Sequence, residues 1–117
     1  MSLVAEQAEF LQDVCKLIEF ATQQGLVVTG GELERKVEMQ EIYIKTGRSK
    51  TMNSMHLKKC AVDLNFFEAV EGRVKLTYDI PKLKPIGDFW EGLRPGKNSW
   101  GGNWNSFKDV PHFERKV

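Results

Sequence analysis

The chain has 117 residues, with 17 basic and 16 acidic side chains and a formal net charge of +1. This length suits one domain with a single hydrophobic core. A hydrophobic content of 41% and a charged content of 28% exclude a disordered chain, and the nearly balanced charge argues against a nucleic-acid-binding surface. We therefore expect residues 1–117 to form one globular domain without a nucleic-acid partner.

No apolar run approaches the roughly 20 residues that a membrane-spanning helix needs, so we expect no membrane span. The N-terminal stretch Met1–Glu6 lacks the basic segment of a secretory signal, which predicts synthesis in the cytoplasm. The two cysteines, Cys15 and Cys60, are far apart and form no CxxC motif. We expect both to be reduced, partly buried thiols.

The first part of the chain predicts a helix followed by a short strand. Apolar residues recur at three- and four-residue spacing over residues 4–24, which is typical of an amphipathic helix. The predicted core face holds Ala8, Leu11, Val14 or Cys15, Ile18, and Ala21 or Thr22. Gly25 suits the end of this helix, and the β-branched run over residues 26–29 predicts a strand.

A second helix is predicted over residues 32–46, and it contains Arg35 and Gln40. The following stretch, residues 47–54, has no periodicity and many turn-forming residues, so we expect a loop. An arginine such as Arg35 at a helix start is more often a solvated charge than a functional residue.

Alternating residues over 61–67 predict a strand that places Val62, Leu64 and Phe66 on the core face and Asp63 on the other face. An aspartate in such a strand is disfavoured unless something compensates its charge, and a metal ion would do so.

The rest of the chain completes the predicted α+β domain, a small antiparallel sheet with helices packed on it. Glu71-Gly72 suits a hairpin turn before a return strand over residues 73–78. A third helix is expected near residues 82–93, with Pro85 either in its first turn or delaying its start. Residues 98–108 predict a shaped loop rich in Gly, Asn and Trp, and residues 111–115 predict a final strand.

Both histidines lie a few residues from an aspartate, His56 before Asp63 and His112 after Asp109. Two imidazoles and one carboxylate can occupy three corners of a tetrahedral zinc site and leave the fourth for water. The remaining carboxylate could then accept a proton from that water. The spacing alone leaves the alternative open that these are ordinary hydrogen-bonded histidines.

Four motifs together carry a resemblance to a known family. They are Ser54-x-His56, Ala61-x-Asp63, Trp100-Gly101-Gly102-x-Trp104 and Asp109-x-x-His112-Phe113-Glu114. In this order they resemble the zinc peptidases that cleave peptidoglycan stem peptides. These are the D-alanyl-D-alanine carboxypeptidases and the phage L-alanyl-D-glutamate endopeptidases, which share the Hedgehog/DD-peptidase fold. The similarity extends from about Val27 to Glu114.

The resemblance implies that one zinc ion is bound by His56, Asp63 and His112, and that Asp109 is the catalytic carboxylate. It also implies that Arg35 contacts the substrate carbonyl or the developing oxyanion. The sequence departs from the family at Lys59, where many members have a glycine three residues after the first histidine. This departure concerns the geometry of the local loop rather than the ligands.

Other residues have less defined predicted roles. Ser54 either orients His56 through a hydrogen bond or only shapes the turn. Arg48 is either a solvated loop charge or a contact to a substrate carboxylate. Gln40 belongs to the segment that resembles the family's upstream region, and Trp100 and Trp104 either line the cleft or pack the loop onto the core.

The sequence thus predicts a zinc metallopeptidase acting on peptidoglycan stem peptides, foremost an L-alanyl-D-glutamate endopeptidase of phage or prophage origin. A D-Ala-D-Ala carboxypeptidase or dipeptidase remains an alternative, as does a non-catalytic zinc-binding member of the fold. We expect a monomer that lacks an appended wall-binding domain. The family resemblance also suggests that it reaches the cell wall through a phage lysis route.

Overall fold

The computed structural model describes residues 2–31, 44–45 and 55–117. The helix predicted over residues 32–46 lies outside this part except for residues 44 and 45, which are helical, and the loop predicted over residues 47–54 lies outside it entirely. The described elements are α1 (Leu3–Gln23), β1 (Leu26–Gly30), the 3-10 helix η1 (Met55–Lys58), β2 (Ala61–Val70), β3 (Arg73–Thr77), α3 (Ile80–Leu93), β4 (Asn98–Trp100), the 3-10 helix η2 (Gly101–Asn103) and β5 (His112–Arg115).

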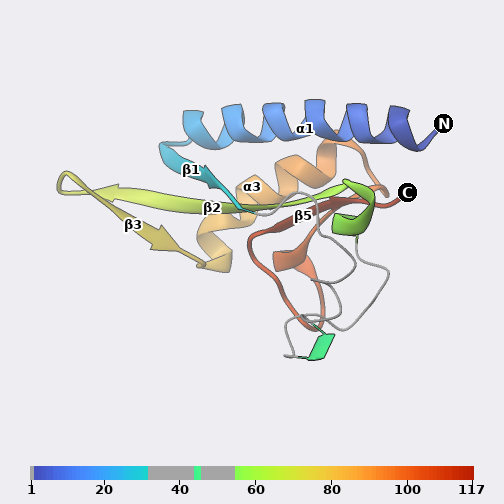
Figure 1. Ribbon diagram of the computed structural model, residues 1–117. Coiled ribbons are helices and arrows are strands. Elements are labelled where there is room, and N and C mark those ends of the chain that lie inside the picture. The colour runs from blue at the N-terminus through green and yellow to red at the C-terminus, as the bar shows by residue number, and fades with distance from the viewer. Residues whose placement is uncertain (1, 32–43, 46–54) are drawn as a thin grey trace.

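The sheet is antiparallel and is organised around β2, its longest strand (Figure 1). Its order is β1-β2-β5-β4, and β3 also pairs with β2. The first residues of β2 pair with β5, whereas its last residues pair with β3, so these two strands occupy different lengths of β2. The β2–β3 hairpin projects from the body of the molecule, and its turn places Glu71 and Gly72 at φ values of 51° and 77°, as expected for a two-residue turn of this kind.

Among the described residues, α1 and α3 pack on one face of the sheet, and the core lies between these helices and the sheet. The core combines α1, α3, β2 and the C-terminal strands; its fully buried members include Phe10, Leu17, Phe66, Leu83, Trp90, Trp100 and Phe113. The predicted core residues Val62, Leu64 and Phe66 are all buried, so the prediction for this strand is confirmed. The α+β class with a small antiparallel sheet is confirmed as well.

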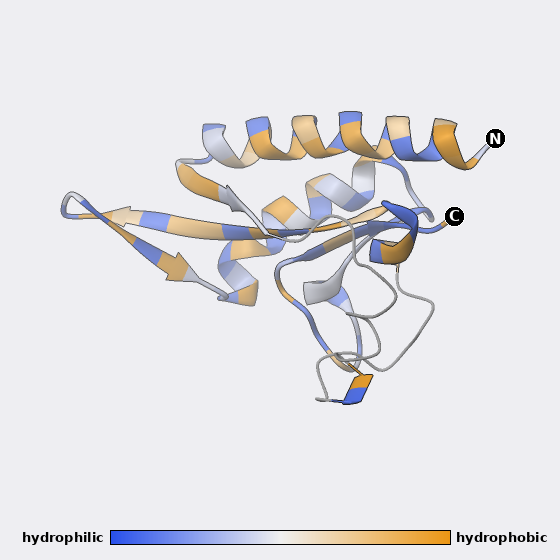
Figure 2. Cartoon of the chain, viewed as in Figure 1, coloured by the Kyte–Doolittle hydropathy of each residue, from blue (hydrophilic) through white to orange (hydrophobic). Residues whose placement is uncertain are grey.

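The predicted extent of the first helix is confirmed, but its predicted core face is wrong in part. Leu11 and Ile18 are exposed, and Ala8 is exposed too. The buried face is rotated about the helix axis and includes two acids, Glu6 and Asp13, with Phe10, Val14, Leu17 and Ala21. Figure 2 shows hydrophobic and hydrophilic residues on both sides of α1. Hydrophobicity alone therefore did not identify which side of the helix is buried.

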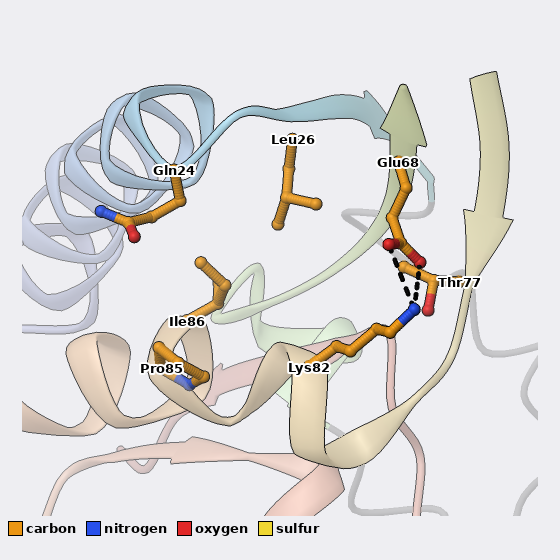
Figure 3. Close-up of a pocket in the computed structure, with 7 residues that line it drawn as sticks. All are labelled: Gln24, Leu26, Glu68, Thr77, Lys82, Pro85 and Ile86. Carbon is orange, nitrogen blue, oxygen red and sulfur yellow. Dashed lines mark hydrogen bonds and ion pairs between the residues drawn. The ribbon is translucent and has the colours of Figure 1, made fainter. Parts of the chain in front are cut away.

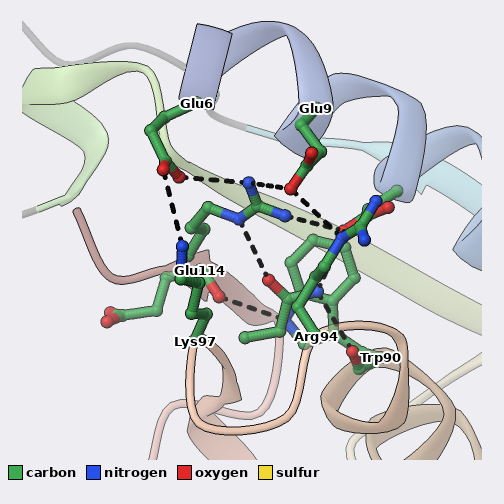
Figure 4. A network of polar contacts seen from close by, with 9 residues as sticks. Glu6, Glu9, Trp90, Arg94, Lys97 and Glu114 are labelled. Atoms are coloured by element: carbon green, nitrogen blue, oxygen red, sulfur yellow. Dashed lines mark hydrogen bonds and ion pairs between the residues drawn. The ribbon is translucent and has the colours of Figure 1, made fainter. Parts of the chain in front are cut away.

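Glu6 and Asp13 of α1 are buried because they contact Arg115, which is fully buried at the end of β5. Arg115 contacts Glu9 Oε1 at 2.7 Å and both Glu6 Oε2 and Asp13 Oδ2 at 3.1 Å. Two further cations approach the same acids, since Arg94 lies 3.3 Å from Asp13 and Lys97 lies 3.6 Å from Glu6. Figure 4 shows Glu6 and Glu9 reaching from α1 toward Arg94 and Lys97. This buried charge cluster ties the N-terminal helix to the last strand.

Two expectations for the second half of the chain need correction. The third helix begins at Ile80, so Pro81 lies in its first turn and Pro85 lies inside it. The helix begins earlier than the predicted start near residue 82. Proline lacks a backbone N–H, but Pro81 lies in the first turn, where that group would have no partner within the helix. The predicted loop over residues 98–108 begins with a strand, β4, which pairs with β5.

Two smaller features concern the cysteines and the membrane. Both cysteines are free thiols, but Cys15 is exposed and Cys60 is buried. In the ranges that the structure describes, no helix is both long enough and apolar enough to cross a membrane.

Candidate metal centre

Asp63 and His112 are direct partners across the β2–β5 pair. Residues in register on neighbouring antiparallel strands project to the same face of the sheet, with their Cβ atoms about 5 Å apart. The Asp63 Oδ1 atom lies 3.6 Å from His112 Nδ1. The sheet register therefore brings together two residues that are 49 positions apart in the sequence.

His56 reaches the same point from η1, the short helix that precedes β2. It is 1% exposed, and its Nε2 atom lies 3.3 Å from Asp63 Oδ1. The chain then turns into β2 through Lys59, whose φ is 56°, while Cys60 N donates to Met55 O. A left-handed residue closes the helix here, which is the conformation that glycine adopts most readily.

The three side chains fit a single metal ion. Among the described residues, His56, Asp63 and His112 form a group whose candidate ligand atoms lie within 4.8 Å of one another. Two ligands at 2.0–2.1 Å from a tetrahedral zinc ion are separated by about 3.4 Å, close to the 3.3 Å and 3.6 Å measured here. Asp63 Oδ1 is buried and accepts no hydrogen bond from the described residues, so a cation would compensate its charge.

The pKa values of Asp63 and His112 are both strongly shifted by their surroundings. Burial by itself raises the pKa of Asp63, but the imidazoles of His112 and His56 outweigh it and hold this pKa far below its usual range. Burial lowers the pKa of His112, but the carboxylates of Asp63 and Glu114 outweigh it and raise this pKa to about 9. A metal ion would therefore have to displace a proton from His112 at neutral pH.

Glu114 is the residue of this site to which the sequence analysis gave no role. Its Oε1 atom lies 2.7 Å from His112 Nε2, so it accepts a hydrogen bond from the far side of the ring and leaves Nδ1 facing Asp63. Carboxylates that hold a histidine ligand in this way fix its tautomer and orientation. The signal was present in the sequence, because residues 112 and 114 of the predicted strand share a face.

Asp109 lies at the exposed rim of the same site. Its Oδ2 atom is 3.9 Å from His112 Nδ1, and its side chain is 46% exposed. The backbone turn between them is closed by His112 N, which donates to Asp109 O. A Cβ atom at Gly101 would overlap the Asp109 carbonyl, so glycine at this position permits the close approach that holds Asp109 there.

The two tryptophans separate into different roles. Trp104 is half-buried, its ring centroid lies 5.1 Å from that of His112, and its Nε1 donates to Ser99 Oγ. Trp100 is fully buried, stacks on Phe113 and donates to Val110 O. Trp104 is thus placed beside the site, whereas Trp100 packs in the core.

Four other residues with predicted roles lie outside the described part of the chain. These are Arg35, Gln40, Arg48 and Ser54. Their roles stay predictions.

A surface hollow of about 310 Å³ lies elsewhere, on the helix side of the sheet. Its lining includes Leu26 of β1, Glu68 of β2 and Lys82 of α3, and Lys82 Nζ contacts Glu68 Oε1 at 3.1 Å across it (Figure 3). Glu68 and Asp63 project to opposite faces of β2 because they are five residues apart. This hollow is therefore separate from the candidate metal centre.

Residues 47–115 match the protein family described as D-alanyl-D-alanine carboxypeptidase. The chain belongs to this family. The match includes all four residues His56, Asp63, Asp109 and His112.

Two peptidases are similar to the chain over most of its length. An L-alanyl-D-glutamate peptidase of Listeria phage A118 is 29% identical over an alignment of 108 positions, which covers 85% of this chain and 34% of the phage protein. The chain thus spans about a third of the length of that relative. The crystal structure of the L-Ala D-Glu endopeptidase ChiX of Serratia marcescens matches with a TM-score of 0.67 and 27% identity, covering 90% of this chain and 79% of that one. The predicted DD-peptidase fold is confirmed by this match.

Proposed function

We propose that this chain is a zinc-dependent peptidase that hydrolyses the L-alanyl-D-glutamate bond of peptidoglycan stem peptides. One observation supports this proposal most strongly. Three ligand atoms, His56 Nε2, Asp63 Oδ1 and His112 Nδ1, converge at spacings of 3.3 Å and 3.6 Å about Asp63, and a further carboxylate, Asp109, lies at the rim.

The protein residues would hold one zinc ion and leave one position open. When bound, zinc supplies a Lewis acid that polarises the amide carbonyl and makes water acidic enough to react near neutral pH. His56, Asp63 and His112 would hold the ion, and the carboxylate of Asp63 would offset one of its two positive charges. Glu114 would keep the Nδ1 atom of His112 turned toward the metal through its contact with Nε2.

Asp109 is proposed as the general base. Its carboxylate is partly exposed at the open rim, where it can accept a proton from the attacking water and return it to the leaving nitrogen. Trp104 forms one side of the site and restricts how a substrate approaches His112. Arg35 is proposed to stabilise the oxyanion; a donor of this kind is commonly worth about 3–4 kcal/mol in the barrier.

The endopeptidase activity is favoured because both similar proteins described above are named for cleavage between L-alanine and D-glutamate. The family description, D-alanyl-D-alanine carboxypeptidase, supports cleavage at the other end of the stem peptide as a second candidate. We further propose that the chain is a monomeric catalytic domain that acts on the cell wall and reaches it through a phage lysis route.

The test is digestion of purified peptidoglycan by the zinc-loaded protein, with the products identified by mass spectrometry. Cleavage of the L-alanyl-D-glutamate bond leaves glycan strands that carry only L-alanine and releases peptides with N-terminal D-glutamate. Release of free D-alanine would instead establish the carboxypeptidase. Absence of any new product, with zinc bound, would refute the proposed peptidase.

A further inference from the structure

The sheet face that carries Asp63 continues beyond the metal centre along β2. Alternation along this unbroken strand places Asn65, Phe67 and Ala69 on the same face as Asp63. Residues Val62, Leu64 and Phe66, which alternate with them, are buried against the helices. The Asp63 face is therefore the side of the sheet that the two described helices leave uncovered.

The neighbouring strands widen this face with apolar residues in register. Val27 of β1 and Leu76 of β3 both pair with Phe67, one on each side of it. Val74 pairs with Ala69. The exposed fractions are 42% for Val27, 42% for Leu76 and 60% for Val74. Figure 2 shows hydrophobic segments recurring between hydrophilic ones along the projecting β2–β3 hairpin.

A tyrosine and an asparagine that are hydrogen-bonded to each other complete the surface. Tyr78 is 52% exposed, and its hydroxyl donates to Asn65 Oδ1 at 3.4 Å. We call this surface the hairpin strip; it consists of Val27, Asn65, Phe67, Val74, Leu76 and Tyr78. It combines an apolar floor with a hydroxyl and an amide.

Among the described residues of β1, β2 and β3, the sheet face that contains the strip carries no ionised side chain besides Asp63. The charged residues of the hairpin strands, such as Lys75 and Glu68, which pair with each other, project to the opposite face. At about 3.3 Å per residue, the sheet face that contains the strip extends about 20 Å along β2 from Asp63 to Ala69. Exposed apolar surface of this kind, continuous with a catalytic site, is typical of a ligand-binding surface.

We propose that the hairpin strip binds the glycan strand of peptidoglycan while the metal centre holds the attached stem peptide. This inference rests on the proposed function and names the part of the substrate that lies beyond the scissile bond. L-alanine joins the stem peptide to the glycan, so cleavage after it places sugar rings close to the metal. The strip is uncharged, which suits amino sugars; the stem peptide, with its D-glutamate carboxylate, is charged.

The recognition chemistry is that of a sugar-binding surface. The phenol ring of Tyr78 and the side chains of Phe67 and Leu76 offer flat apolar area to the C–H faces of the sugars. The Tyr78 hydroxyl and the Asn65 amide offer hydrogen bonds to hydroxyl and acetamido groups. The strip follows the projecting β2–β3 hairpin, so a long polymer has room to extend past the hairpin tip (Figure 1).

The test compares two substrates and two matched variants. The substrates are intact peptidoglycan sacculi and a free stem peptide that starts with L-alanyl-D-glutamate and has no glycan. The strip variant is Leu76→Thr with Tyr78→Thr, and the control is Lys75→Thr on the opposite face of the same strand; threonine preserves strand propensity. Binding to peptide-free glycan strands is measured by co-sedimentation as a readout independent of hydrolysis.

We expect the strip variant to cleave sacculi with about a tenfold higher KM and to bind glycan about tenfold more weakly, because it loses apolar contact worth about 1.4 kcal/mol. Its kcat/KM on the free peptide should match the wild type, and Lys75→Thr should match the wild type in every assay. Equal activity of the strip variant and the wild type on sacculi would overturn the inference while leaving the peptidase intact. A change of oligomeric state in the strip variant would assign the strip to a second copy of the chain instead. Failure of the wild type on both substrates would refute the proposed function itself.

Discussion

The Nε2 atom of His112 lies 2.7 Å from Oε1 of Glu114, two residues further along β5. Removal of this carboxylate by Glu114→Ala should lower zinc affinity about 10–100-fold, because the imidazole loses the partner that fixes its tautomer and orientation. Glu114→Gln should lose less, since its amide oxygen can still accept the hydrogen bond. Competition with a chromogenic chelator measures both, with Glu68→Gln as the control away from the site. Unchanged affinity in Glu114→Ala would show that the contact does not orient the ligand.

The metal-free protein should lose stability as the pH rises above neutrality. The pKa of His112 is raised to about 9 in the folded chain, above its ordinary value of about 6.5 in the unfolded chain. The protonated ring therefore stabilises the fold fully below pH 6.5, and this contribution, on the order of 3 kcal/mol, is lost as the pH rises through 9.

Thermal unfolding in the presence of a chelator, measured between pH 6 and pH 10, checks this expectation. The zinc-loaded protein should show the opposite trend over the lower part of this range, because metal binding requires His112 to lose its proton. A metal-free protein whose melting temperature is constant from pH 6 to pH 10 would contradict the raised pKa.

Arg115 should be among the most sensitive positions in the chain. Its guanidinium is fully buried and contacts Glu6, Glu9 and Asp13. Arg115→Met keeps much of the side-chain volume but leaves these acids without their central cation, which should cost about 3–5 kcal/mol. Chemical denaturation measures this loss, and Lys84→Met, which removes only exposed contacts with Asp88 and Asn103, should change stability by less than about 1 kcal/mol. Similar effects of the two substitutions would mean that the buried charge cluster contributes little.

Lys59→Gly should stabilise the protein. Lys59 adopts a φ of 56°, which costs a residue with a side chain about 1–2 kcal/mol, whereas glycine adds about 0.4–1 kcal/mol of unfolded-state entropy. The net gain should be about 0.5–1 kcal/mol in the free energy of unfolding. Lys59→Ala removes the same charge but keeps the strain, so it should bring no such gain. Equal stabilisation by both would assign the effect to charge.

The departure at Lys59 shows what a resemblance can and cannot supply. The sequence comparison predicted that a family glycine was replaced and that the local loop was affected. The structure adds the reason, a left-handed residue between η1 and β2 that any replacement must still adopt. The resemblance also implied that His56, Asp63 and His112 share one ion, whereas the spacing alone left that open; the β2–β5 register then brings Asp63 and His112 together.

Features that depend on the tertiary structure were not predictable in this way. The face of α1 was misplaced because Glu6 and Asp13 are polar and look solvent-exposed until Arg115 is brought to them from the other end of the chain. The separate roles of Trp100 and Trp104 follow from which ring packs on Phe113. Pro85 is tolerated inside α3, whereas its sequence position suggested a boundary. Long-range partners decide the first two of these cases.

The central claim is that three residues bind zinc and that Asp109 acts on the substrate without binding the ion. The most direct measurement is the zinc content of the purified wild type and of His56→Ala, Asp63→Ala, His112→Ala and Asp109→Ala, paired with stem-peptide hydrolysis. We predict one zinc per chain in the wild type and in Asp109→Ala, with hydrolysis reduced about 10²–10⁴-fold in the latter. The other three variants should lose both zinc and activity. Normal hydrolysis by Asp109→Ala, or full zinc content in His56→Ala and His112→Ala, would contradict the account.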